Sequence, residues 1–375
     1  MNKNIVIACQ SCGYLVRDII KAYSNDGYNV TLISSKSSWA SIEQDLPKKV
    51  GYRFVIAYDR SLFAKRLFTW IICTIQMWLI IFLYHRKAEL LMVSNPPLCP
   101  LLPRLLPNKY SLLIWDVYPD VVVSQGILSR DNFLVKWWGR QNRIVFEKAK
   151  WVYTISQGMK SRLMRYVNES KIKVFPLWPN GSISRVEKKD NRFIKEQGLE
   201  GKFVVLYSGN FGNTHRMDVL LDVAKLIKDD DIVYLLIGEG GKKMLIEERI
   251  AREKLNNVRL LPYQSLTILP HSLSSADIAV VTLDLSTANM SVPSKTFNLM
   301  AVGAPLLCIA SPNSELGNMV RKYDVGEIFS PDNVREMAQF IIKLKRNPDV
   351  RDVYSNNSLV AAKKFTSENA KIFLE

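Results

Sequence analysis

The sequence predicts an α/β protein built from two Rossmann-like domains in tandem. Short apolar runs of strand length alternate with helical segments, and this series occurs twice along the 375 residues. A polar, charged stretch near residues 180–200 separates the two series. Strand–helix alternation is typical of doubly wound parallel sheets, and a chain of this length is too long for a single core.

The first series starts with a buried-type strand over residues 4–8, which a loop and a helix follow. Gly27 stops that helix, and the next strand begins at Asn29. The expected strands of the first half are residues 4–8, 29–34, 89–93, 110–115 and 151–155, and its expected helices are residues 14–24, 65–84 and 157–168.

The second series begins after the charged stretch 187–200. Its expected strands are residues 203–207, 232–237, 258–261, 278–282 and 305–309, and its expected helices are residues 217–228, 243–254 and 294–302. The turn Pro179-Asn180-Gly181 and the polar run behind it mark the boundary. We therefore divide the chain into an N-terminal domain of residues 1–185 and a C-terminal domain of residues 186–375.

Positive charge is concentrated in the first domain. Residues 1–185 contain 26 Lys and Arg against 11 Asp and Glu, a net charge of +15, whereas residues 186–375 carry a net charge of +1. This asymmetry indicates that the first domain meets an anionic partner, either a membrane surface or a nucleic acid. A solvated basic surface without a partner is the alternative.

The cysteines and histidines do not predict a metal site. The five cysteines form no regular framework, which favours free thiols in a reducing compartment, and the three histidines are far apart in sequence. Cys9 and Cys12 have the spacing of a redox or zinc motif, but no second Cys or His pair accompanies them. We expect no metal and no other cofactor.

Residues 67–84 form an uncharged apolar segment with Lys65 and Arg66 before it and Arg86 after it. Its length reaches the lower limit for a transmembrane helix. A crossing here would place strands of one sheet on opposite sides of the membrane. We therefore predict a helix that packs one face on the sheet and buries the other in the bilayer interface. A fully buried core helix is the alternative.

A second basic and aromatic patch follows at Lys136-Trp137-Trp138, with Arg140 and Arg143 nearby. Aromatic rings beside cationic side chains suit the depth of lipid headgroups. Plain packing of the two tryptophans is the alternative. The two patches together favour contact of the first domain with an anionic membrane surface.

The strand at 203–207 ends in a glycine-rich turn that has the features of an anion site. The turn reads Ser208-Gly209-Asn210-Phe211-Gly212-Asn213-Thr214-His215-Arg216, and a helix follows. Glycines let backbone N–H groups approach an anion, and the helix N-terminus, His215 and Arg216 add positive charge. The turn therefore suits a diphosphate, while glycines that serve turn geometry alone are the alternative.

A second candidate lies at the start of the helix expected at 294–302. Pro293 and Ser294 favour a helix start, and Asn298 shares the face of Ser294 one turn deeper. With Lys295, this helix end carries a hydroxyl, an ammonium and an amide, which suit a phosphate and a ribose or sugar hydroxyl. A capped core helix with an exposed lysine is the alternative.

Further motifs occur in a consistent order along the chain. They are "SNPPL" at 94–98, "WDVYPD" at 115–120, "TISQGM" at 154–159, "PNG" at 179–181, "YSGNFG" at 207–212, "ADIAVVTLD" at 276–284 and "VPSKTFNLMAVGAP" at 292–305. This set resembles the retaining GT-B glycosyltransferases of family 4, notably the bacterial members that build O-antigen, capsule and exopolysaccharide. The resemblance covers essentially the whole chain and implies the GT-B fold, with two Rossmann-like domains and an interdomain cleft.

The resemblance implies a nucleotide sugar, with UDP as the expected nucleotide, bound by the second domain without a metal. Tyr263 is placed to stack on the base, with a packing role as the alternative. The residues expected to bind the nucleotide sugar are Gly209, Asn210, Gly212, His215, Gly238, Tyr263, Gln264, Ser294 and Asn298. Lys295 and Arg216 are expected to stabilise the departing diphosphate.

In the first domain, Asp116 ends a sheet strand and is expected to orient or deprotonate the acceptor hydroxyl, or else to cap the next segment. Gly13 is expected to let the acceptor, or a phosphate of the donor, approach the backbone. The resemblance implies a lipid-linked acceptor, such as a polyprenyl-diphosphate-linked saccharide. The expected place of work is the cytoplasmic face of the inner membrane, with peripheral attachment.

The chain departs from the family pattern at two places. Many relatives carry two glutamates eight positions apart, where this sequence has Met290 and Asn298. Many also place Arg and Lys in the diphosphate loop, where this sequence has Asn210 and His215. A carboxylate contact to the sugar is therefore missing from the expected site.

The predicted function is transfer of a hexosyl or N-acetylhexosaminyl group, with retention, in the assembly of lipopolysaccharide or capsule. Three alternatives stay open. A nucleotide-sugar epimerase shares the fold but would have no need of a basic, membrane-facing half. A catalytically silent partner subunit would explain the missing glutamates. A nucleic-acid-binding protein is supported by charge alone and lacks a recognition motif.

Overall fold

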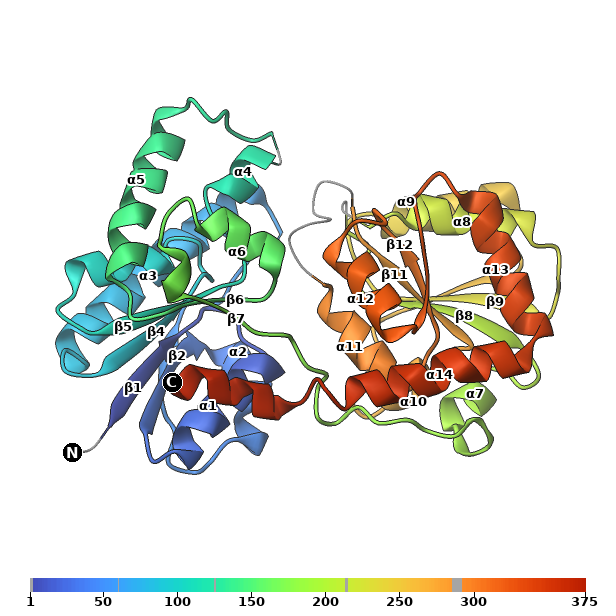
Figure 1. Cartoon of the computed structure of the whole chain (residues 1–375), viewed down its shortest axis with the longest axis horizontal. Coiled ribbons are helices and arrows are strands. Elements are labelled where there is room, and N and C mark those ends of the chain that lie inside the picture. The colour runs from blue at the N-terminus through green and yellow to red at the C-terminus, as the bar shows by residue number, and fades with distance from the viewer. Residues whose placement is uncertain (1–2, 60, 125, 213–214, 285–291) are drawn as a thin grey trace. The chain divides into compact units, whose positions relative to one another are not determined.

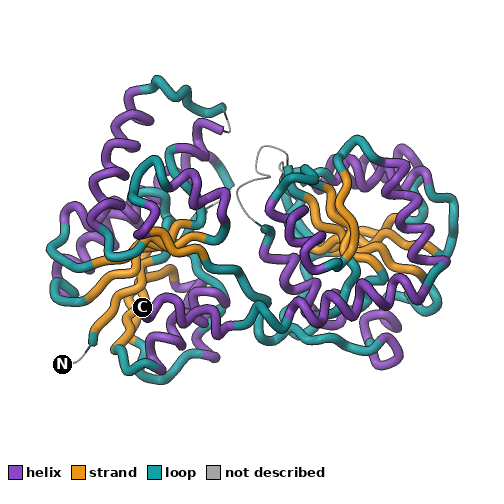
Figure 2. The backbone as a smooth tube through the Cα atoms, in the orientation of Figure 1, coloured by secondary structure: helices purple, strands orange, loops and turns teal. Residues whose placement is uncertain are grey.

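The computed structural model describes residues 3–59, 61–124, 126–212, 215–284 and 292–375. The chain forms two compact units (Figure 1). Unit 1 contains Met1–Pro176 and Ser367–Glu375, and unit 2 contains Leu177–Thr366. In each unit a parallel sheet lies between helices on both faces (Figure 2).

The predicted division into residues 1–185 and 186–375 is corrected at both ends. Leu177 and Trp178 are buried in unit 2, and the Asn180 amide donates to Asn298 Oδ1 at 3.0 Å, so the boundary lies nine residues earlier. The end of the chain returns to unit 1, where Phe373 is buried and its carbonyl accepts from Tyr23 Oη at 2.8 Å. Local packing of apolar side chains therefore sets both boundaries.

Unit 1 contains a seven-stranded parallel sheet in the order β3-β2-β1-β4-β5-β6-β7 within the described residues. Its strands are β1 Asn4–Ala8, β2 Asn29–Ser35, β3 Gly51–Val55, β4 Glu89–Val93, β5 Tyr110–Ile114, β6 Val152–Thr154 and β7 Ile172–Val174. Its helices are α1 Tyr14–Asn25, α2 Lys36–Ala40, α3 Phe63–Tyr84, α4 Asp120–Ser124, α5 Phe133–Lys148 and α6 Gln157–Leu163, with 3₁₀ segments η1 Glu43–Asp45, η2 Cys99–Leu105, η3 Glu169–Lys171 and η6 Ser367–Leu374.

The core of unit 1 explains why these segments form a sheet with attached helices. Alternate strand residues such as Val6, Leu90 and Leu112 point to one face, where the inner stripe of α3 and the end of α5 cover them. On α3 that stripe includes Cys73 and Met77, which are fully buried. The order of the strands reverses between β1 and β4, which is where parallel sheets of this type bind ligands.

Unit 2 contains a six-stranded parallel sheet in the order β10-β9-β8-β11-β12-β13 among the described residues. Its strands are β8 Phe203–Ser208, β9 Ile232–Ile237, β10 Val258–Leu261, β11 Ile278–Thr282, β12 Leu306–Ile309 and β13 Gly326–Phe329. Its helices are α7 Arg192–Glu196, α8 Met217–Leu226, α9 Lys243–Glu253, α10 Leu269–Leu273, α11 Ser294–Ala301, α12 Glu315–Tyr323, α13 Val334–Arg346 and α14 Pro348–Ala362, and η4 Lys188–Asp190 precedes them.

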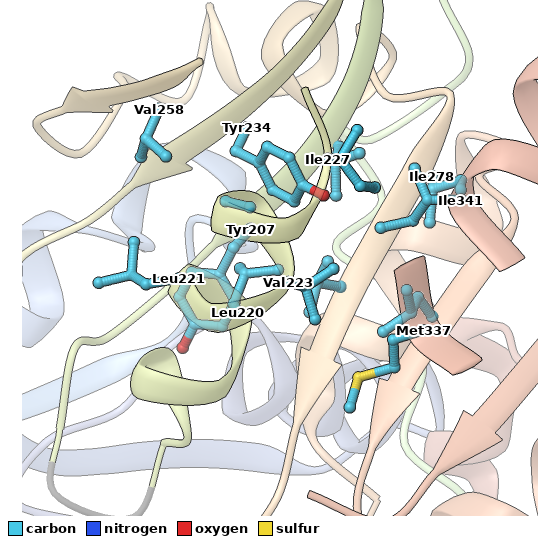
Figure 3. Close-up of a cluster of buried hydrophobic side chains, with 14 of the residues drawn as sticks. Tyr207, Leu220, Leu221, Val223, Ile227, Tyr234, Val258, Ile278, Met337 and Ile341 are labelled. Carbon is cyan, nitrogen blue, oxygen red and sulfur yellow. The ribbon is translucent and has the colours of Figure 1, made fainter. Parts of the chain in front are cut away.

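The core of unit 2 fixes the strand ends that carry the candidate site. Side chains of the sheet, including Tyr234 and Ile278, interlock with Leu220 of α8 and with Met337 and Ile341 of α13 (Figure 3). Nearly continuous apolar strands such as β9, buried along its whole length, require helices on both faces of the sheet. The strand order reverses between β8 and β11, so the loops after these two strands meet at one edge.

The predicted elements are confirmed wherever a strand is buried on both faces, and three strands were not predicted. β3, β7 and β13 are edge strands, and residues 52–54 of β3 are exposed. Their composition therefore lacks an apolar run. The helix predicted at 157–168 is shorter, because α6 ends at Leu163 and a turn follows.

Candidate functional site

The glycine-rich loop after β8 packs backbone to backbone against the loop after β9. A Cβ on Gly238, which has a φ of +159°, would lie 1.9 Å from the Gly209 carbonyl oxygen. The Phe211 amide donates to the Glu239 carbonyl at 2.8 Å, and the Lys242 amide donates to the Phe211 carbonyl at 2.9 Å. The absence of a side chain at Gly238 is therefore what allows the two loops to close on each other.

Lys295 in the first turn of α11 reaches the same loop. An ideal Cβ on Gly209 would lie 2.5 Å from Lys295 Nζ, and this nitrogen lies 3.8 Å from the centroid of the Tyr207 ring. The loop after β8 and the start of α11, which were predicted to serve one site, lie side by side.

The ammonium group of Lys295 has no hydrogen-bond partner within the described residues, although its nitrogen is buried. The residue as a whole is half-buried. Burial of the nitrogen lowers the pKa of Lys295 to about 7. A buried ammonium without a hydrogen-bond partner is costly in the unligated protein, although the Tyr207 ring offsets part of this cost, and an anion at this position would relieve the rest.

His215 stands on the other side of Tyr207, where its Nδ1 lies 3.2 Å from Thr282 Oγ1 at the end of β11. Burial, reinforced by the charge of Lys295, lowers the pKa of His215 to about 4. The imidazole is therefore neutral near pH 7 and offers a hydrogen bond rather than a charge. Thr282 was not among the predicted residues, although its position after an apolar strand places it at this edge.

Arg216 was predicted to stabilise the diphosphate, but its charge is already engaged. It caps α8, and its guanidinium pairs with Asp218, with Nη2 lying 3.0 Å from Oδ2. A cation that was not predicted also contacts the loop: Lys242 Nζ donates to the His215 carbonyl at 3.2 Å. The role of Arg216 at the diphosphate stays a prediction, and its guanidinium is paired with Asp218 in the unligated protein.

On α11, Ser294 is exposed and Asn298 is half-buried. Asn298 Oδ1 accepts the hydrogen bond from the Asn180 amide, so one half of this side chain holds the turn at 179–181. Within the described residues its Nδ2 group forms no hydrogen bond, and it remains available to a sugar or ribose hydroxyl. Met290, the other position of the glutamate pair, lies outside the described residues.

The remaining residues predicted for the nucleotide lie at the same edge of the sheet. Asn210 approaches Gly240, where a Cβ would lie 2.5 Å from its Oδ1, and the Asn210 carbonyl accepts from Tyr207 Oη at 2.8 Å. Gly212 accepts from the His215 amide at 3.1 Å. Beyond β10, Tyr263 is 53% exposed. Gln264 Nε2 donates to the Pro262 carbonyl at 2.8 Å.

In unit 1, Asp116 and Gly13 lie after strands β5 and β1 at the carboxyl edge of that sheet. The Asp116 amide donates to Ser94 Oγ at 3.3 Å; the side chain reaches the surface, while the protein around it raises the pKa of the carboxyl by desolvation. Gly13 caps α1 with extended backbone, and a Cβ there would meet nothing within 4 Å. An added Cβ at Gly13 would therefore meet open space, and the approach of an acceptor or a phosphate to this backbone stays a prediction.

Helix α3 is the one helix of the described residues that is long and apolar enough to cross a membrane, as judged by length and composition. Only 28% of its apolar window is buried, which excludes the fully buried core helix. Its outward stripe consists of Leu67, Phe68, Ile71, Ile75, Leu79 and Leu83, all more than 40% exposed. Its inner face packs in the core of unit 1, so the helix is attached to the sheet along its length.

The tryptophans of α5 differ from one another. Trp138 stacks on Tyr118 with ring centroids 5.7 Å apart, which is a packing role. Trp137 is 45% exposed and lies beside the exposed Phe133 and Leu134. In the part of the chain that the structure describes, no three His, Cys, Asp or Glu side chains are grouped in a way that could hold a metal ion.

Comparison with known proteins supplies independent findings. Residues 189–359 match the family described as Glycosyl transferases group 1. The chain is 25% identical over 263 residues to the probable glycosyltransferase WbjE of Pseudomonas aeruginosa, covering 68% of this chain and 66% of WbjE. It is 26% identical over 217 residues to the putative colanic acid biosynthesis glycosyl transferase WcaI of Escherichia coli strain K12, covering 56% of this chain and 53% of WcaI. The matches thus span less than two thirds of these relatives.

Solved structures resemble the chain over its whole length. Anabaena Alr3699/HepE in complex with UDP and glucose superposes with a TM-score of 0.74 at 15% identity, covering 100% of this chain and 98% of HepE. WaaG, a glycosyltransferase involved in lipopolysaccharide biosynthesis, gives a TM-score of 0.71 at 13% identity, covering 98% of this chain and 99% of WaaG. At these identities the likeness concerns the fold, and it confirms the predicted GT-B architecture of two parallel-sheet domains.

Proposed function

We propose that the chain transfers a sugar from a UDP-sugar, with retention, to a lipid-linked acceptor at a membrane surface, because residues 189–359 match the family described as Glycosyl transferases group 1. The observation that carries the proposal is the buried, unpartnered ammonium of Lys295 beside the glycine loop after β8. A similar fold binds UDP and glucose in Alr3699/HepE. The descriptions of WcaI and WaaG, which name colanic acid and lipopolysaccharide biosynthesis, support a role in polysaccharide assembly.

In this proposal the loop after β8 and the start of α11 hold the diphosphate of the donor. Lys295 neutralises the charge that develops as UDP departs, and backbone N–H groups of the loop and the α8 N-terminus assist it. Tyr263 stacks on the uracil and Asn298 Nδ2 donates to a hydroxyl. These groups stabilise the developing charge, and the proposal assigns no step to a metal. The acceptor hydroxyl attacks from the face that UDP leaves, which retains the anomeric configuration.

Unit 1 is assigned to the acceptor. Asp116 orients the attacking hydroxyl and takes its proton as the new bond forms. The outward stripe of α3 lies in the bilayer interface, because exposed leucine, isoleucine and phenylalanine side chains gain free energy there. The basic excess of this part of the chain adds attraction to anionic lipids. Attachment is peripheral, at the cytoplasmic face of the inner membrane.

The test uses radiolabelled UDP-sugars incubated with the protein and a membrane lipid extract. Transfer is expected to move label into the organic phase in wild type and not in the Lys295→Met variant. Free epimerised nucleotide sugar would replace the proposal with an epimerase. Failure to bind or consume any UDP-sugar would favour the silent partner subunit, for which the amide at Asn298 in place of a carboxylate is the supporting observation.

A further inference from the structure

A second cationic site lies in unit 1. Helices α4 and α6 lie side by side there with α5 next to them (Figure 1), and they surround a cavity of about 380 Å³. Four arginines line this cavity, namely Arg130, Arg143, Arg162 and Arg165. We refer to it as the arginine cavity.

The charge of the arginine cavity is only partly balanced. Among its lining residues, Asp120 is the one carboxylate, and it accepts from Arg165 Nη1 at 2.9 Å and from Tyr166 Oη at 2.5 Å. The other three arginines form no ion pair within the described residues. Four guanidinium groups against one carboxylate leave a charge of +3 around one cavity. An excess of positive charge around one cavity favours the binding of an anion.

Hydrogen bonds and close packing hold the walls of the cavity together. Asn142 Nδ2 donates to the Tyr118 carbonyl at 2.6 Å, which ties α5 to the segment before α4. At Gly139 an ideal Cβ would lie 3.6 Å from Cε1 of Tyr166, so α5 packs closely on the segment after α6. Arg143 Nε donates to the Arg165 carbonyl at 3.3 Å. These contacts therefore hold in place the segments that carry the arginines.

An exposed apolar surface adjoins the cavity. Val123 and Val135 belong to its lining, and Val135 sits in the first turn of α5. The neighbouring Phe133 and Leu134 are 76% and 56% exposed, and Trp137 follows one turn later. A ligand that fits both features carries a multiply charged anion next to a hydrocarbon chain.

We propose that the arginine cavity binds the phosphate or diphosphate group of a membrane lipid, with the hydrocarbon lying along the first turns of α5. The planar guanidinium group binds phosphate oxygens in pairs, which a lysine ammonium does not. The proposal rests on the proposed function in one respect, namely that the acceptor is lipid-linked. Asp116 follows β5 and lies four residues before α4, so the cavity and Asp116 share the carboxyl edge of one sheet.

The test measures flotation of the full chain with phosphatidylcholine vesicles that contain solanesyl diphosphate, a long-chain polyprenyl diphosphate. The cavity variant is Arg130→Gln/Arg162→Gln. The matched control is Arg53→Gln/Arg104→Gln, which removes the same charge from exposed positions of unit 1 outside the cavity. The cavity variant is expected to lose about tenfold or more in apparent affinity, and the control less than about threefold.

Each outcome bears on the proposal. Equal losses in both variants, or a loss of the same size on phosphatidylcholine alone, overturn it. A selective loss that extends to phosphatidylglycerol vesicles supports it and identifies a headgroup phosphate as the source. If the cavity variant loses affinity for soluble inorganic pyrophosphate but not for the diphosphate vesicles, the proposal that the ligand is a lipid is overturned. If the double variant unfolds, the test is displacement of the wild-type protein from the diphosphate vesicles by pyrophosphate, measured with saturating UDP present. Displacement supports the proposal, and its absence overturns it. UDP affinity, measured by calorimetry, tests unit 2. Absence of UDP binding would contradict the proposed function, and it would leave the flotation result for the arginine cavity unchanged.

Discussion

The two cationic sites of this molecule use charge in opposite ways. In unit 2 one lysine, Lys295, holds a buried ammonium without a partner, and burial lowers its pKa to about 7. In unit 1 four arginines share a cavity with one carboxylate, and three of their side chains are exposed. A single desolvated charge gives strong, geometrically strict binding, whereas several hydrated charges give weaker binding that is tolerant of pH.

The difference matches the ligands that we assign. A departing diphosphate must be stabilised at one position, where low polarity strengthens the interaction. A lipid phosphate at a membrane surface has to be captured and released, and partly hydrated guanidinium groups permit this. The following predictions test whether the two sites differ as described.

The largest effect is expected for Lys295→Met. UDP affinity should fall by about 100-fold, because a desolvated charge pair is lost. The unligated protein should become more stable by about 2–4 kcal/mol, because a lysine whose pKa is depressed from 10.5 to about 7 destabilises the fold at neutral pH. Calorimetry with UDP and thermal melting measure the two effects.

The control for this variant is Lys243→Met on α9, since Lys243 pairs with Glu239 at the surface near the same loop. It should leave UDP affinity and the melting temperature nearly unchanged. Equal effects in the two variants would contradict a special role for the buried ammonium.

The pH dependence should separate the two sites next. UDP binds the protonated form of Lys295, whose pKa in the free protein is about 7, so affinity should fall by up to about tenfold per pH unit above this value. Arginines stay charged throughout, so flotation with diphosphate vesicles should be flat from about pH 7.5 to 9.5. Parallel calorimetry and flotation over this range supply the comparison, and a flat UDP profile would remove Lys295 from the titrating role.

An intermediate effect is expected for Gly209→Ala. The new Cβ would lie 2.5 Å from Lys295 Nζ, at a residue whose φ of +154° suits glycine, so the ammonium must move. UDP affinity should fall by about tenfold. Gly241→Ala is the matched control, because nothing lies within 4 Å of its Cβ and its φ is not positive. Similar losses in both variants would mean that any change in this glycine region disturbs binding.

Substitution of the outward stripe of α3 should have the smallest effect. Ile75→Ser is expected to reduce flotation with anionic vesicles by about threefold to tenfold, since one partly exposed apolar side chain leaves the interface. The melting temperature should not change. Leu226→Ser, at a 51% exposed apolar position of unit 2, is the control and should float like wild type. Unimpaired flotation of the Ile75 variant would argue against α3 as the membrane contact.

Much of the fold follows from sequence because its central strands are buried on both faces. The apolar runs of β1, β8 and β9 carry this signal without ambiguity. The edge strands β3, β7 and β13 carry no such run, since one side of each has no neighbouring strand. Parallel topology also brings Gly209 and Lys295 together, because the carboxyl ends of neighbouring strands share an edge.

The sequence predicted which types of residue form the site, but it did not predict which side chains pair with each other. Arg216 is followed by Asp218, but only the folded chain shows that the two side chains engage each other. The position of the Lys242 ammonium depends on the path of the loop, which composition does not predict. The arginine cavity combines positions from 130 to 165 on three segments, so no local motif marks it.

The central claim is that the loop after β8 and the start of α11 hold a diphosphate through Lys295. A crystal structure of the protein with UDP tests it most directly. We predict a phosphate oxygen within hydrogen-bond distance of Lys295 Nζ and beside the Gly209–Gly212 backbone. A diphosphate bound away from Lys295, with its ammonium still buried and unpartnered, would contradict the claim.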